Sequence, residues 1–142
     1  MHPKRLSVEE GASAVEFALV SFVLILFVAG IIQFGHIFFQ WLELTHSARE
    51  GARWAALRND AGSVSTPGTV RHKVAEAAPG LRPGLTDVQI VIDPEVTTGL
   101  TGQPVRVTVS YETPLFAPLM QNIFNVSGTT FTLTSSATQR IE

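Results

Sequence analysis

An uncharged apolar run at residues 17–42 constrains this chain more than any other feature of its sequence. The run holds no Asp, Glu, Lys or Arg over about 26 residues, and as a helix rising 1.5 Å per residue it would extend roughly 39 Å. Because about 20 such residues cross the hydrocarbon core of a bilayer, the run predicts a transmembrane helix. Glu16 stands directly before it. A carboxylate at that position needs either headgroup water or a partner of opposite charge.

Length and composition limit what can follow this helix. The 142 residues leave room for one membrane segment and one small domain, and the formal net charge of −2 argues against a nucleic-acid-binding protein. The absence of cysteine excludes disulfides, thiolate metal sites and a cysteine nucleophile, and it leaves the redox compartment undetermined. A domain of about 80 residues must therefore fold on its apolar core, and docking on a helix or on neighbouring subunits would help to stabilise it.

The parts at the N-terminus come in an unusual order for an export signal. Lys4 and Arg5 precede the apolar run, as in such signals. A conventional signal has its small-residue cleavage site after the apolar region, whereas the small residues 11–14 come before it and no A-x-A pattern follows Ile32. If the chain is cut, the cut is therefore expected ahead of the run, and the anchor is retained.

Several short motifs resemble those of one bacterial protein family. Gly11, with Glu16 five residues later and an apolar helix after it, resembles the recognition sequence of prepilin peptidases, which cleave type IV pilins and pseudopilins after the glycine. The longer match is to the TadE-like family, the pseudopilins of tight-adherence (Flp-type) pilus systems. It is close over residues 9–58 and rests on Gly11-Ala12-Ser13-Ala14-Val15-Glu16-Phe17-Ala18-Leu19-Val20, Gln33-Phe34-Gly35 and Ala48-Arg49-Glu50-Gly51-Ala52-Arg53-Trp54-Ala55-Ala56.

This resemblance implies a processed and assembled membrane protein. Residues 1–11 would be a cytoplasmic leader, removed between Gly11 and Ala12. Glu16 and Phe17 would set the register between subunits, with the Glu16 carboxylate paired to the new amino terminus of a neighbour in a low-dielectric bundle. From the residues alone, Glu16 could equally be a headgroup-level carboxylate with no special partner. Many family members have a proline early in this helix where the chain has Ser21-Phe22, so no kink is implied here.

Orientation in the membrane follows from the resemblance and not from the charges. Lys4 and Arg5 lie on the N-terminal side of the apolar run, while three basic residues follow it. The positive-inside rule therefore does not decide which end of the helix faces the cytoplasm. The family implies a cytoplasmic N-terminus in the bacterial inner membrane and a periplasmic or extracytoplasmic soluble domain. It also implies as partners the prepilin peptidase, other pilins or pseudopilins, the inner-membrane assembly platform and membrane lipid.

The helix is predicted to continue beyond the membrane. Residues 43–58 contain no proline and are rich in Ala, Leu, Glu and Arg, so the whole helix is expected over residues 12–58, about 47 residues or roughly 70 Å. Gly51 inside a helix costs about 1 kcal/mol relative to Ala, which predicts a close approach by another element. Arg49, Glu50 and Arg53 form either a solvated face or a subunit contact. The predicted apolar stripe consists of Leu44, Ala48, Ala52, Ala55 and Leu57.

Residues 59–142 are predicted to form a small soluble α+β domain. A turn-forming cluster at 59–68 reads as a flexible connection, and residues 69–78 as a short helix stopped at Pro79-Gly80. Alternating apolar residues predict strands at 87–93, 105–112 and 130–137, with Val88 and Phe131 on the apolar side. Strands with one apolar face indicate an antiparallel sheet that covers a helix. Together with the long helix before it, the resemblance implies a pilin-like fold.

Two further segments of this domain carry predictions. Residues 114–125, between the last two strands, are rich in large apolar side chains and are either a short helix that caps the sheet core or an apolar patch for a partner subunit. The glycosylation triplet Asn125-Val126-Ser127 is interpreted as coincidental, because the resemblance is to a bacterial family.

No catalytic constellation can be assembled from the sequence. The histidines (His2, His36, His46 and His72) lie in separate predicted segments, and none has H-E-x-x-H spacing. Asp87, Asp93 and Glu95 read most simply as turn or polar-face residues. We therefore expect no enzyme activity, no cofactor, no metal and no small-molecule substrate. The favoured function is a minor pseudopilin; the alternative is an uncleaved, single-span membrane protein whose soluble domain binds an exported partner or scaffolds an envelope machine.

Overall fold

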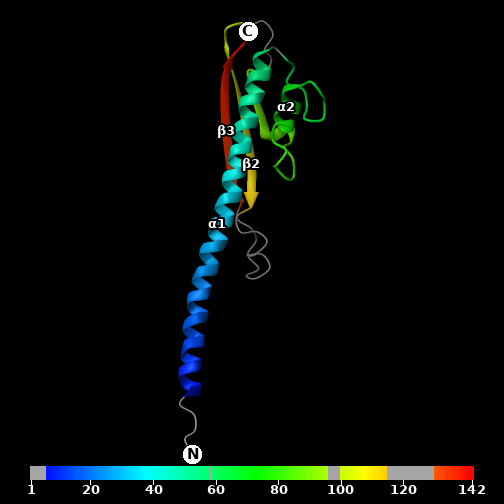
Figure 1. The fold of residues 1–142 in the computed structure, drawn as a ribbon. Coiled ribbons are helices and arrows are strands. Elements are labelled where there is room, and N and C mark those ends of the chain that lie inside the picture. Colours follow the sequence, from blue (N-terminus) through cyan, green and yellow to red (C-terminus); the bar gives the residue numbers. More distant parts are fainter. Residues whose placement is uncertain (1–5, 58, 96–99, 115–129) are drawn as a thin grey trace, which may run out of the picture. The chain divides into compact units, whose positions relative to one another are not determined.

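The computed structural model of the chain describes residues 6–57, 59–95, 100–114 and 130–142. The elements follow in the order α1 (Leu6–Ala56), α2 (Val70–Glu76), the 3-10 helix η1 (Asp87–Gln89), β1 (Ile90–Asp93), β2 (Pro104–Pro114) and β3 (Thr130–Arg140) (Figure 1). The predicted α+β fold is confirmed, with a long N-terminal helix, a short helix and a three-stranded antiparallel sheet. The chain divides into two units, Met1–His36 and Ile37–Glu142, and α1 contributes to both.

The first unit is described as helix from Leu6 onward. α1 begins five residues before the predicted processing point, so Gly11 and Ala12 both lie within the helix. Every described side chain between 11 and 20 is exposed, and the large apolar side chains that follow are also mostly exposed. No other described element belongs to this unit.

In the second unit, α1 presents a stripe of small side chains to the core. Leu44, Ala48, Ala52 and Ala55 are all fully buried, as their helical spacing predicted. The prediction for Leu57 is wrong, because α1 ends at Ala56 and the Leu57 side chain is 48% exposed.

Two hydrogen bonds cap the C-terminal end of α1. The side-chain Nδ2 of Asn59 donates to the Trp54 carbonyl over 2.9 Å, and the backbone N–H of Glu142 donates to the Ala56 carbonyl over 3.0 Å. The last carbonyls of a helix have no partner within it, so these donors satisfy groups that would otherwise need water.

The short helix α2 forms close to where the sequence placed it. Thr69 is its N-cap, and the Thr69 hydroxyl accepts a hydrogen bond from the His72 backbone N–H over 3.4 Å. Val70 and Val74 are buried one turn apart, and Pro79-Gly80 follows the end of the helix. α2 therefore adds one apolar edge to the core formed by α1.

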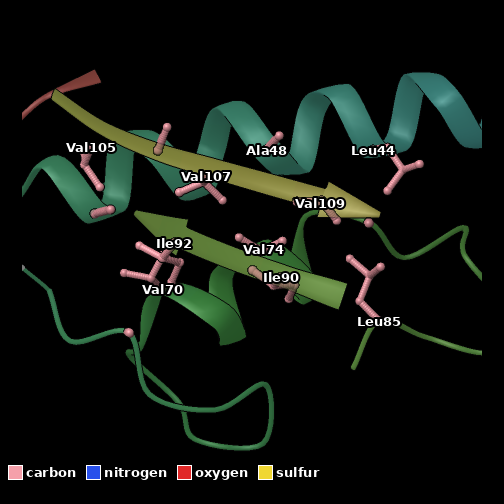
Figure 2. Close-up of a cluster of buried hydrophobic side chains, with 14 of the residues drawn as sticks. Leu44, Ala48, Val70, Val74, Leu85, Ile90, Ile92, Val105, Val107 and Val109 are labelled. Carbon is pink, nitrogen blue, oxygen red and sulfur yellow. The ribbon is translucent and has the colours of Figure 1, made fainter. Parts of the chain in front are cut away.

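The sheet has the order β1-β2-β3, and both pairs are antiparallel. In β2, Val105, Val107 and Val109 are fully buried, and the residues between them are exposed or half-buried. This period-2 alternation turns one face of the sheet toward the helices. Figure 2 shows the resulting core, in which β1 and β2 contribute Ile90, Ile92, Val105, Val107 and Val109, and the helices contribute Leu44, Ala48, Val70 and Val74.

One prediction for the sheet is wrong. Val88 lies in η1 instead of a strand and is 86% exposed, because Thr86 and Gln89 form a capping box that turns the chain before β1 begins. Phe131 lies in β3 on the predicted apolar face, opposite the buried Thr113, but its side chain is 50% exposed because it is near the start of an edge strand.

The predicted close approach at Gly51 is confirmed. A Cβ atom built on Gly51 would lie 2.3 Å from Val74 Cγ2 and 3.2 Å from Val107 Cγ1. α1, α2 and β2 therefore meet at this residue, and any side chain would push against at least one of them.

Some predictions fall on residues outside the described ranges. They concern the leader residues 1–5, the helix end at Arg58, the connection at 115–125 and the triplet that begins at Asn125. The boundaries proposed for leader, helix and soluble domain also stay predictions.

Candidate functional site

The residues predicted for processing and register lie together on the first unit of α1. Gly11, Ala12, Glu16 and Phe17 are all exposed, and a Cβ on Gly11 would meet nothing within 4 Å. Glu16 takes part in none of the ion pairs found among the described residues. The Glu16 side chain is thus exposed on the surface of α1, directly before the apolar run.

The apolar run is not covered by the rest of the described chain. Among the described residues, one helix is long and apolar enough to cross a membrane, and none of the residues in its most apolar window is buried. A core helix of a water-soluble protein would bury most of such a window, because exposed apolar surface in water is unfavourable. The exposed run therefore indicates a membrane anchor.

One face of this run has a shallow apolar groove centred on Gly30. Leu26 and Phe27 lie one turn before Gly30, and Phe34 lies one turn after it. A Cβ on Gly30 would meet nothing within 4 Å, so the chain itself does not need the glycine for packing. Small residues of this kind let helices approach each other closely in membranes.

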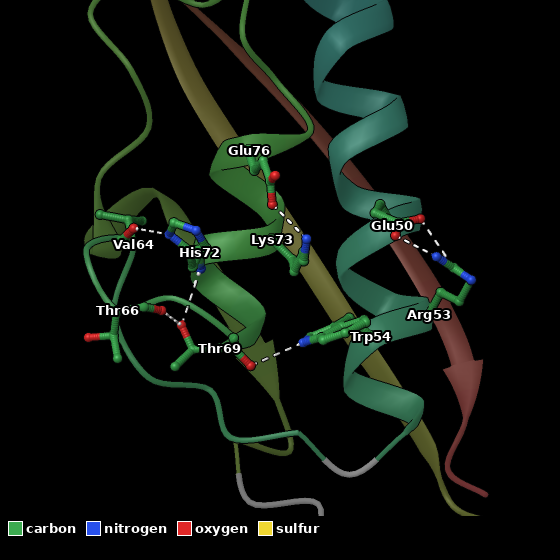
Figure 3. Close-up of polar contacts among 10 residues, drawn as sticks. Glu50, Arg53, Trp54, Val64, Thr66, Thr69, His72, Lys73 and Glu76 are labelled. Atoms are coloured by element: carbon green, nitrogen blue, oxygen red, sulfur yellow. Dashed lines mark hydrogen bonds and ion pairs between the residues drawn. The ribbon is translucent and has the colours of Figure 1, made fainter.

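The predicted contact residues on the second half of α1 lie on an exposed, charged surface. Arg53 donates twice to Glu50, from Nε to Oε2 over 3.1 Å and from the terminal nitrogen to Oε1 over 2.6 Å (Figure 3). This hydrogen bonding lowers the pKa of Glu50 and raises the pKa of Arg53. Arg49, next to Glu50, is exposed. An exposed ion pair contributes little to stability, so the geometry fits a solvated face and a contact surface equally.

α2 extends the same charged surface. Lys73 donates to Glu76 over 2.7 Å, and the Lys73 ammonium lies 5.6 Å from the ring centre of Trp54 on α1 (Figure 3). The Trp54 indole N–H donates to the Gly68 carbonyl over 3.3 Å. These contacts tie α2 and the preceding loop to α1 beside Glu50 and Arg53.

Comparison with known protein families gives a match for the segment that carries these features. Residues 11–53 match the TadE-like protein family. The matched stretch starts at Gly11 and ends at Arg53, so it includes Glu16, the apolar run and the charged residues of α1. The predicted resemblance is confirmed over this stretch. Comparison with curated proteins and with solved structures gave no match.

The TadE-like segment and the exposed helix together indicate a membrane protein associated with a Tad pilus. TadE-like proteins form a family of pilus components, and other pilus components are therefore the indicated partners. The TadE-like segment coincides with most of α1, whereas the sheet and α2 lie beyond it.

Sequence reasoning missed how firmly the loop at 59–69 is attached. Asp87 accepts from the Ser63 hydroxyl over 2.8 Å and from the Val64 N–H over 2.7 Å, and His72 Nδ1 donates to the Val64 carbonyl over 2.8 Å. The two hydrogen bonds to Asp87 lower the pKa of its carboxyl group. The connection predicted to be flexible is thus held at several points.

Arg71 makes a second set of attachments near this loop. Its guanidinium donates to the Gly62 carbonyl over 2.7 Å, to Glu95 Oε1 over 2.8 Å and to the Ile90 carbonyl over 3.4 Å. Arg71 therefore joins α2 to the loop before it and to β1. The turn acids Asp87 and Glu95 bind structural partners in this arrangement, as their simplest interpretation predicted.

The described ranges contain no group of three or more His, Asp or Glu side chains that could hold a metal ion. His36 lies in the first unit and His46 on the second half of α1, where its ring is 3.3 Å from the Ala77 carbonyl. The His72 ring is hydrogen-bonded to the Val64 carbonyl in the loop before α2.

Proposed function

We propose that this protein is a minor pilin or pseudopilin of a tight-adherence (Flp, type IVb) pilus. It is inserted in the bacterial inner membrane with its N-terminus in the cytoplasm and its soluble domain on the opposite side. A prepilin peptidase removes residues 1–11. The observation that supports this most strongly is a TadE-like match beginning at Gly11, on a helix whose apolar window contains no buried residue. Its partners are the peptidase, other pilins or pseudopilins, the assembly platform and lipid.

Processing would change the electrostatic setting of Glu16. In the uncut chain α1 begins at Leu6, so Glu16 is the eleventh helical residue. After a cut behind Gly11, Glu16 becomes the fifth residue from a new, positively charged amino terminus. Carboxylates near a helix N-terminus are favoured by the partial positive charge there. Cleavage thus supplies the cation that Glu16 lacks among the described ion pairs.

Assembly would then place this charge between subunits. Helices in a bundle exchange lipid contacts for contacts with one another, and a charge pair in such a low-dielectric setting strongly penalises a shifted register. The exposed apolar faces of residues 17–36 supply the packing surface, and the Glu16 carboxylate with the Ala12 amino group of a neighbour supplies the register.

The decisive test is the N-terminus of the membrane form. In cells with an active prepilin peptidase, N-terminal sequencing and intact mass should show a chain that begins at Ala12. Gly11→Val should leave the leader attached, because the peptidase no longer finds its glycine, while the open space around Gly11 allows the side chain. Ser13→Ala is the matched control and should be cut normally.

A chain that keeps Met1 in those cells would contradict processing. It would favour the alternative, an uncleaved single-span membrane protein whose soluble domain binds an exported partner or scaffolds an envelope machine. The unbroken course of α1 through Gly11 is the observation that fits this alternative.

A further inference from the structure

Four large side chains form an exposed collar at the beginning of the second unit. Phe38, Phe39, Trp41 and Leu42, here called the aromatic collar, are between 43% and 48% exposed. The rings of Phe38 and Trp41 stack with their centres 6.0 Å apart. The second unit starts at Ile37, so these residues belong to the folded domain and not only to the apolar run.

Polar contacts fasten this part of α1 to the domain. Gln40, in the middle of the aromatic collar, is buried, and its side-chain carbonyl accepts a hydrogen bond from the buried hydroxyl of Thr113. Glu43 accepts from the Gly80 N–H over 3.2 Å. A Cβ on Gly80 would lie 2.6 Å from Phe39 Cε1, so the Phe39 ring lies against this backbone. The aromatic collar is therefore attached to the domain without an intervening linker.

The length of the apolar run places the aromatic collar at a definite depth. Residues 17–37 as a helix extend about 32 Å, close to the roughly 30 Å hydrocarbon core of a bilayer. If Glu16 lies at one surface of the membrane, Phe38 and Trp41 reach the other. Glu43 is the first charged residue after the run. Tryptophan and other aromatic side chains are favoured at this boundary, because one part of the ring is apolar and another tolerates water.

Gln40 also fits this depth. An amide without a hydrogen-bond partner is costly in an apolar environment. Thr113, which belongs to the domain, donates the hydrogen bond that the Gln40 side-chain carbonyl accepts. The polar side chain of Gln40 is therefore satisfied by the domain, and the exposed side chains beside it are apolar. The aromatic collar directly follows the apolar run in the sequence, and its own side chains are large, apolar and exposed. These properties fit lipid as its neighbour.

We propose that the aromatic collar lies in the boundary between headgroups and acyl chains, in the leaflet opposite Glu16. The second unit then rests directly on the lipid surface, and the membrane span is residues 17–37 instead of the whole run to Leu42. This inference rests on the membrane insertion in the proposed function.

The two tryptophans of the chain provide a direct test. Trp54→Phe leaves Trp41 as the only indole, and Trp41→Phe leaves Trp54, which is 13 residues or about 20 Å further along α1. Each full-length variant is reconstituted in vesicles of phosphatidylethanolamine and phosphatidylglycerol that carry a spin label either near the headgroup or near the acyl-chain end. Circular dichroism checks that both variants are folded, and flotation checks that they are bound to the vesicles.

The fluorescence of Trp41 should be quenched more by the spin label near the headgroup than by the one near the acyl-chain end. The fluorescence of Trp54 should be quenched little by either label. If the variant floats with the vesicles but the fluorescence of Trp41 is not quenched, the inference is overturned and the membrane insertion is not. The same holds if the deep label quenches the fluorescence of Trp41 more than the shallow label does. Failure to float would overturn the proposed insertion, and the inference with it. Loss of Trp41 quenching as the protein-to-lipid ratio rises would show that a second copy covers the aromatic collar, which also overturns the inference.

A second measurement avoids any change to the tryptophans. The chain has no cysteine, so Leu42→Cys and Arg49→Cys each introduce one thiol at an exposed position. In lipid nanodiscs, which are open to reagent on both sides, a water-soluble maleimide should modify Cys at position 49 much faster than Cys at position 42. The two rates should become similar after denaturation in detergent. Equal rates in the nanodisc would contradict the proposed depth.

Discussion

At the residue scale, Asp87 shows how a single exposed carboxylate can organise a loop. It receives one hydrogen bond from a side chain and one from the backbone of the segment before α2. Because both donors prefer the ionised carboxylate, they lower the pKa of Asp87. The native state therefore holds a proton at this position less readily than the unfolded chain does.

This shift predicts a pH dependence of stability. A carboxylate whose pKa is lowered on folding stabilises the native state above its ordinary pKa of about 3.9, and this contribution is lost as the pH falls through the lower native value. Asp87→Asn should therefore lower the urea midpoint of the full chain in detergent at pH 7, and the difference from wild type should shrink below about pH 4.

Asp93→Asn is the matched control, because Asp93 is an exposed carboxylate on neighbouring β1. It should leave the midpoint nearly unchanged across the same range. A difference between Asp87→Asn and wild type that stays constant from pH 7 to well below about pH 4 would show that the loop does not depend on the charge of Asp87.

At the scale of elements, the domain depends on how closely α1 approaches α2 and β2. Small residues line the buried stripe of α1, and Gly51 marks the tightest point. A helix-interior glycine normally lowers helix stability by about 1 kcal/mol relative to alanine. Its presence here follows from the space that Val74 and Val107 occupy.

Gly51→Ala should therefore destabilise the protein despite the better helix propensity of alanine. Overpacking a core costs about 1–3 kcal/mol, which exceeds the gain of about 1 kcal/mol from propensity. The double variant Gly51→Ala/Val74→Ala removes the Val74 methyl carbon that lies 2.3 Å from the added Cβ. It should lose less stability than the sum of the two single variants.

Urea unfolding of the four proteins followed by circular dichroism measures this cycle. If Gly51→Ala alone raises the midpoint, or if the two effects simply add, the close contact at Gly51 does not limit the packing of α1.

At the scale of the whole molecule, the chain joins an exposed apolar helix to a domain with its own core. The core of the second unit is closed by α1, α2 and the sheet, whereas the apolar residues of the first unit are left for lipid or for other helices. Folding of the domain and the proposed assembly of the helices therefore depend on different residues, and they can be disturbed separately.

Glu16→Gln should separate these two properties. The variant should still insert in the membrane with a folded domain, because Glu16 makes none of the described ion pairs within the chain. Its recovery with cross-linked pilus components should fall clearly, since the neutral amide cannot pair with the amino terminus of another subunit. Glu112→Gln, an exposed carboxylate on β2, serves as the control. Normal co-assembly of Glu16→Ala would exclude the register role.

The sequence by itself determined the apolar helix, the short helix, the three strands and the TadE-like motifs. Each of these is read from neighbours two to five residues apart, whose spacing must match the period of a helix or strand or the motif itself. The same local rules misplaced Val88, because a capping box interrupted the alternation. They also misplaced Leu57, because Asn59 and Glu142 cap a helix that ends at Ala56.

Only the tertiary structure decided which residues join distant parts of the chain. Gln40 and Thr113 are 73 residues apart, and Ser63 and Asp87 are 24 apart. Such pairs leave no periodic signal, because their partners come together only when the sheet has folded against α1 and α2. The sequence predicted that something must approach Gly51, but the fold identified Val74 and Val107. It likewise assigned Phe38 and Trp41 to the folded domain instead of to the anchor alone.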